Sequence, residues 1–73
     1  MFLVESKSAQ VTTTTQQFSV AKDGYTPIGI VGFAIANTSA QINYMLINGT
    51  DVSLRATNST AFYYNVLYVK NLA

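Results

Sequence analysis

The sequence lacks cysteine, histidine and tryptophan. Without cysteine the chain forms no disulfide and offers no thiolate to a metal. Without histidine it also lacks the commonest metal ligand and the commonest general base near neutral pH. The three carboxylates, Glu5, Asp23 and Asp51, lie far apart in the sequence, and no glycine-rich phosphate loop is present. We therefore expect no metal, no cofactor and no catalytic residue, and hence a protein that is not an enzyme.

Charge is also scarce. Charged residues make up 10% of the chain, with a net charge of +1, whereas an ordinary soluble domain has about 25%. No basic stripe is present, so we expect no nucleic-acid partner. The longest apolar stretch, residues 28–36, is interrupted by two glycines and is too short for membrane insertion. The remaining polarity comes from Thr, Ser, Asn and Gln, which favours an extracellular or virion surface.

The short length limits the core. A chain of 73 residues forms one domain, and such a domain buries only about 60% of its unfolded surface. Small domains of this kind are usually stabilised by disulfides, metals or partner subunits. Because the first two are excluded, the sequence favours association with further copies of itself.

Strand signals run along the whole chain, and no window has helical periodicity. The pattern predicts an all-β fold of about six antiparallel strands connected as a meander, closed as a small β-sandwich or a jelly-roll-like barrel. Asn48-Gly49 is the strongest turn signal and predicts a hairpin. Gly29 and Gly32 indicate a bulge or a close backbone approach. The predicted strands cover residues 2–6, 11–20, 27–37, 41–48, 51–58 and 61–70.

Several of these strands are apolar on both faces, although a two-layer domain has one interior. In the last strand, Tyr64 and Tyr68 are in phase with Phe62 and Val66, which predicts that they belong to the core. The opposite face would form an exposed apolar surface larger than monomers usually tolerate. We expect this surface to be a subunit interface, unless a closed barrel hides part of it. Its leading residues are Val31, Phe33, Ile35, Leu67 and Val69.

Tyrosines on strands also bind ligands, because the ring stacks on sugars and the hydroxyl forms hydrogen bonds. Tyr63 shares its face with Asn65, so it is the best candidate for an exposed tyrosine. If adjacent strands of the meander pair, Arg55 lies nearby. Tyr63, Asn65 and Arg55 are therefore the predicted ligand-binding residues.

Two segments are distinctive: residues 24–33 (Gly-Tyr-Thr-Pro-Ile-Gly-Ile-Val-Gly-Phe) and residues 66–70 (Val-Leu-Tyr-Val-Lys). Together with the pattern over residues 11–70, they resemble the C-terminal domains of tail-fibre and baseplate-type proteins of phages and prophages. The resemblance implies an adhesive, homotrimeric tip on the virion that binds a host cell-surface glycan. The family has no shared ligand motif, so no site residue is inherited from it.

The resemblance also implies that residues 1–73 form a single β domain, the C-terminal tip of a longer fibre-type protein. The initial methionine departs from this, since such domains normally end a much longer chain. A purely structural virion module, which trimerises a fibre or decorates a capsid and binds no small ligand, is the alternative function.

Overall fold

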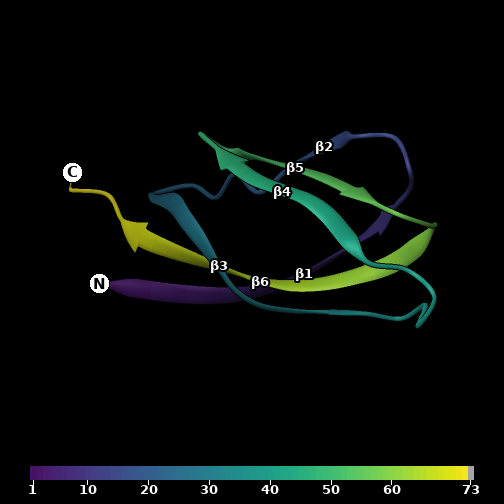
Figure 1. The fold of residues 1–73 in the computed structure, drawn as a ribbon. Coiled ribbons are helices and arrows are strands. Elements are labelled where there is room, and N and C mark those ends of the chain that lie inside the picture. The colour runs from purple at the N-terminus through teal and green to yellow at the C-terminus, as the bar shows by residue number, and fades with distance from the viewer. Residues whose placement is uncertain (73) are drawn as a thin grey trace.

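Antiparallel strand pairing organises residues 1–72, the part of the chain that the computed structural model describes (Figure 1). The strands form two three-stranded sheets with the orders β1-β6-β3 and β2-β5-β4. The predicted small all-β sandwich of six antiparallel strands is confirmed. The strands are β1 (Phe2–Val11), β2 (Gln16–Ser19), β3 (Tyr25–Ile35), β4 (Ile42–Asn48), β5 (Asp51–Ala56) and β6 (Thr60–Lys70).

The strands do not follow a meander, and that part of the prediction is wrong. Only β4 and β5 pair as consecutive strands, and every other connection passes from one sheet to the other, as in a jelly roll. β5 cannot pair with β6, because β6 already pairs with β1 on one side and with β3 on the other. Since β1 and β6 pair antiparallel, the start of β1 and the end of β6 lie side by side (Figure 1). The Lys70 N–H donates to the Met1 carbonyl at 2.9 Å.

The first two strands have different lengths from those predicted. β1 continues past residue 6 to Val11, because all ten of its residues pair with β6. The polar strand predicted over residues 11–20 is reduced to the four residues of β2. The Thr12 hydroxyl accepts a hydrogen bond from the Thr14 N–H at 3.2 Å, and such local bonds favour a turn over an extended strand.

The core lies between the two central strands, β5 and β6. Every second side chain of each strand points inward and is buried, as expected for a pleat of period two. The Tyr68 hydroxyl donates to the Val20 carbonyl at 2.7 Å, so the phenol is hydrogen-bonded inside the core. The predicted burial of Tyr64 and Tyr68 is confirmed. The inward residues are Val52, Leu54, Ala56, Phe62, Tyr64, Val66 and Tyr68.

Two irregularities in β3 change which of its residues face the core. The pairing with β6 shifts between Pro27 and Gly29 and again between Ile30 and Phe33. Each bulge adds residues to one strand only and so shifts the alternation of its side chains. Strict alternation along a strand would place Ile30 and Ile35 on opposite faces, whereas both pack against the core. Ile35 therefore does not belong to the predicted exposed apolar surface, because it pairs with the core residue Phe62.

The predicted hairpin at Asn48-Gly49 is present. Asn48 pairs with Asp51, so Gly49 and Thr50 form a two-residue loop. Gly49 has a φ of 63°, and no residue other than glycine has a positive φ among the described residues. Glycine with a positive φ at the first loop position is the arrangement of a type II′ turn, whose twist matches that of the flanking strands.

Replacing Gly49 by alanine should lower the free energy of unfolding by about 1 kcal/mol, because a side chain is strained at this φ. Urea unfolding followed by circular dichroism measures the change. Gly29→Ala is the matched control: Gly29 has no atom within 4 Å of an added Cβ and no positive φ. Equal losses in the two variants would contradict the turn assignment.

Removing the Tyr68 hydroxyl in Tyr68→Phe should cost about 1–3 kcal/mol, because the buried Val20 carbonyl loses its partner. Tyr63→Phe makes the same chemical change on the exposed face of the same strand and should change stability by less than about 0.5 kcal/mol. Chemical unfolding of both variants tests the difference. A Tyr68→Phe protein as stable as the wild type would show that this hydrogen bond contributes nothing.

Candidate functional site

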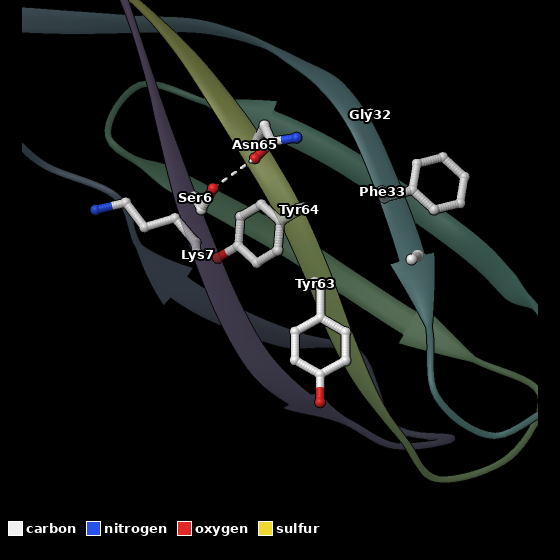
Figure 2. Close-up of a pocket in the computed structure, with 8 residues that line it drawn as sticks. Ser6, Lys7, Gly32, Phe33, Tyr63, Tyr64 and Asn65 are labelled. Atoms are coloured by element: carbon white, nitrogen blue, oxygen red, sulfur yellow. Dashed lines mark hydrogen bonds between the residues drawn. The ribbon is translucent and has the colours of Figure 1, made fainter.

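A hollow of about 310 Å³ opens on the β1-β6-β3 sheet, where all three strands contribute to its wall (Figure 2). The side chains of Ser6, Tyr63 and Asn65 supply polar groups on the outer face of the sheet. Lys7, Phe33 and Tyr64 border the hollow from the rows whose side chains lie on the inner face. The full lining is Ser6, Lys7, Gly32, Phe33, Ala34, Tyr63, Tyr64 and Asn65.

The second bulge of β3 forms the wall of this hollow. The register jumps from the Ile30–Val66 pair to the Phe33–Tyr64 pair, so Val31 and Gly32 together face the position of Asn65. Gly32 has a φ of 119°, and a Cβ there would lie 3.6 Å from the Asn65 amide nitrogen. The bulged backbone therefore favours glycine at this position through its positive φ, whereas a Cβ would make only an ordinary contact with Asn65.

The polar groups of the hollow are held in fixed positions. The Ser6 hydroxyl donates to the Asn65 side-chain oxygen at 2.8 Å (Figure 2). This bond fixes the amide oxygen toward Ser6 and leaves the amide nitrogen, which donates to no described side chain, available to a ligand. The Tyr64 side chain, which also borders the hollow, points into the core, and this burial raises the pKa of its hydroxyl.

Tyr63 stands beside this amide on the outer face of the sheet. Its cross-strand neighbours are small, Ser8 on β1 and Ala34 on β3. The ring is consequently 51% exposed and extends away from the strand (Figure 2). The arrangement offers a ligand an aromatic face next to amide and hydroxyl groups.

The structure brings together two of the three predicted ligand residues. Tyr63 and Asn65 line the same hollow, whereas Arg55 lies on β5 in the other sheet. The Arg55 Nε donates to the Asn43 side-chain oxygen at 3.2 Å, and its guanidinium lies 5.5 Å from the centre of the Tyr44 ring. The expected proximity of Arg55 to Tyr63 is wrong, because β5 and β6 lie in different sheets and these two residues point away from the core between them.

Sequence reasoning did not identify Ser6 as part of this site. Ser6 falls on a strand whose full pairing was not predicted, and it pairs directly with Asn65 in the register. Gly32 was correctly associated with a bulge, but no residue pattern indicated that the bulge would lie beside Asn65.

The residues predicted to line a trimer axis lie on two faces. Leu67 and Val69 are on the outer face of the β1-β6-β3 sheet, opposite Val4 and Phe2 of β1. Phe33 is on the inner side, 55% exposed, with its ring centre 5.5 Å from that of Phe62.

Ile35 and Val31 are the remaining two of the five residues predicted to line the trimer axis. Ile35 packs against the core, and Val31 lies exposed in the bulge. The five residues therefore do not form one continuous surface. The homotrimer itself stays a prediction.

Charged side chains gather at the free edge of β1. Glu5 forms ion pairs with Lys7 at 3.3 Å and with Lys22 at 2.9 Å. Lys7 lies 5.9 Å from the Tyr68 ring centre, and Lys22 lies 5.6 Å from that of Tyr25. These contacts hold both ammonium groups in place at the edge of β1.

Within residues 1–72, no three carboxylates come together in a group that could hold a metal ion. The same part of the chain contains no helix long and apolar enough to cross a membrane. No protein-family model matches the chain, and no curated protein or solved structure shows significant similarity to it.

The ion pairs at β1 predict a pH dependence. Hydrogen bonds from Lys22 and Lys7 lower the pKa of Glu5 in the folded protein. A lowered folded-state pKa stabilises the fold above the unfolded pKa, and this contribution is lost as the pH falls below about 4. The midpoint of thermal unfolding should therefore drop more between pH 6 and pH 3 in the wild type than in Glu5→Gln. Equal pH dependence in the two proteins would show that Glu5 makes no such contribution.

Proposed function

We propose that this chain is a non-catalytic adhesive module that binds a neutral cell-surface glycan in the hollow around Tyr63 and Asn65. The observation that carries the proposal is the placement of an exposed tyrosine ring beside an oriented amide on one rigid strand. The resemblance to phage tail-fibre and baseplate tips supports a virion setting, in which the ligand is on the host surface.

The chemistry of the lining fits a sugar. A pyranose presents an apolar face of C–H groups to an aromatic ring and hydroxyl groups to hydrogen-bonding partners. Tyr63 supplies the ring, and Asn65 and Ser6 supply the polar groups. Both sides of the hollow belong to β-strands, which hold these groups more precisely than loops do.

The charge of the hollow favours a neutral ligand over an acidic one. Lys7 is the only charged residue in the lining, and its ammonium group is paired with Glu5 at 3.3 Å. An anionic sugar would have to compete with this carboxylate for the ammonium. A neutral hexose needs no charged partner and can use the amide and hydroxyl groups that are already in place.

The open shape of the hollow implies weak binding at a single site. Tight small-molecule sites usually enclose most of their ligand, whereas this hollow is open to solvent along the β1-β6-β3 sheet. An adhesive protein overcomes weak single sites by presenting several copies, because the second contact then forms at a high effective concentration. Self-association of the module would supply these copies.

The alternative is a purely structural virion module. It is supported by the exposed apolar side chains of Phe2 and Val4, which are 66% and 52% accessible and lie opposite Val69 and Leu67. An apolar surface of this kind also suits contact with another protein. A module of this type would bind no glycan, so a binding measurement separates the two functions.

Glycan-array screening followed by an NMR titration with the best neutral oligosaccharide tests the proposal. Tyr63→Ala should weaken binding by about tenfold, because it removes the stacking surface. Arg55→Ala is the matched control and should bind as the wild type does, since Arg55 lies on the opposite sheet. Absence of binding to any array glycan, or equal effects of the two substitutions, would reject this site and favour the structural alternative.

A further inference from the structure

The two sheets leave four strands with a free edge: β1 and β3 in one sheet, β2 and β4 in the other. A free edge presents unpaired N–H and C=O groups, to which a further strand can add. Proteins prevent such addition with short edge strands, proline, bulges or inward-pointing charges. The four edges of this molecule differ sharply in these protections.

Three edges are protected. β2 has only four residues. β3 contains Pro27 and two shifts of register. In β1, Glu5 pairs with Val66 and Lys7 pairs with Tyr64, whose side chains point into the core. The two charged side chains of β1 therefore lie on the inner face. A strand added beside β1 would remove water from this pair of charges.

β4 has almost none of these protections. Its seven residues include no charge and no proline. Its one irregularity lies between Ile42 and Tyr44, and from Tyr44 to Asn48 it pairs regularly with β5. Both of its faces carry exposed apolar side chains, since Leu46 is 46% and Met45 is 38% accessible.

The space beside β4 is also unfilled. A second hollow, of about 190 Å³, is lined by Gly29 and Ile30 of β3 and by Met45 and Ile47 of β4. It lies along the side where the two sheets end in β3 and β4. Apolar side chains of the core thus reach the surface next to the one edge that can accept a strand.

We propose that β4 pairs antiparallel with β4 of a second copy of this chain, about a two-fold axis at Leu46. The two β2-β5-β4 sheets then become one continuous sheet of six strands. The inner face of the new pair covers the open side of the hollow at Met45 and Ile47. The assembly is a two-fold pair rather than the three-fold one that the resemblance implies.

The free edge of β4 is complementary to itself, which is why we assign the pairing strand to a second copy of this chain. In this register Leu46 lies opposite its own equivalent, and Met45 lies opposite Ile47, so apolar residues meet on both faces. An axis at Met45 would instead place Asn43 opposite Ile47. Because the same edge is used by both copies and the other edges are protected, the pair closes and does not grow into a fibre.

The charges near the join are compatible with this register. Asn48 would face Tyr44 of the second copy, and their partners on β5 are Asp51 and Arg55. Asp51, Asn48, Tyr44 of the second copy and Arg55 of the second copy then lie side by side on four adjacent strands. Asp51 and Arg55 are separated by three strand spacings, about 14 Å. Salt largely screens an attraction over this distance, and no two charges of the same sign meet at the join.

Sedimentation equilibrium over a dilution series tests the proposal. The wild type should have twice the chain mass of 7.9 kDa, and Leu46→Lys should have the mass of one chain with an unchanged circular-dichroism spectrum. Val4→Lys is the matched control, because Val4 is slightly more exposed than Leu46 and lies on the outer face of the other sheet; this variant should remain a dimer. A monomeric wild type, or dissociation by Val4→Lys alone, would overturn the proposal.

A cross-linking experiment tests the register without relying on a charge. The natural chain has no cysteine, so Leu46→Cys introduces a single thiol. Residues directly opposite on antiparallel strands have Cα atoms about 4.5–5.5 Å apart, within reach of a disulfide. Mild oxidation should give a covalent dimer of Leu46→Cys but not of Ser8→Cys, on the exposed face of β1. The reverse result would place the interface on the β1 edge. Glycan binding at a single Tyr63 site does not depend on the outcome, so this inference and the proposed function can fail separately.

Discussion

Contact between the inward side chains of β5 and β6 holds this molecule together. Phe62 and Tyr64 stack with ring centres 5.2 Å apart, and Tyr68 adds a hydrogen bond that anchors the segment between β2 and β3 through Val20. Large aromatic side chains bury more apolar surface than aliphatic ones. They therefore let a short chain without disulfides form a core from a few residues. Because β6 is flanked by β1 and β3, the same strand that supplies the core also fixes the outer surface where Tyr63 and Asn65 lie.

The alternation of β6 shows how much of this arrangement can be predicted from sequence. Burial of Tyr64 and Tyr68 and exposure of Tyr63 follow directly from the two-residue period, and the structure confirms them. The hairpin at Gly49 was predictable for a similar reason, because its chemistry is local. Tyr63 and Asn65 were placed together correctly because residues two apart on a strand share a face.

Features that depend on non-local pairing were not predictable. The position of Arg55 required knowledge of which strands are neighbours, and a single sequence does not say whether β5 and β6 share a sheet. The length of β1 was hidden because Glu5 and Lys7 occupy inward positions at an edge, where ion pairs replace apolar contacts. The faces of β3 were misassigned because a bulge shifts the alternation and leaves only its glycines as a trace in the sequence.

The side-by-side termini have a mechanical and architectural consequence. The Lys70 N–H bonds to the Met1 carbonyl at 2.9 Å, so the chain enters and leaves the module at nearly the same point. A domain with adjacent ends can be inserted into a surface loop of a host protein with little disturbance to either partner. A force applied between those two ends would pull β1 away from β6 and break the hydrogen bonds between them one after another. It would not load all of these hydrogen bonds at the same time.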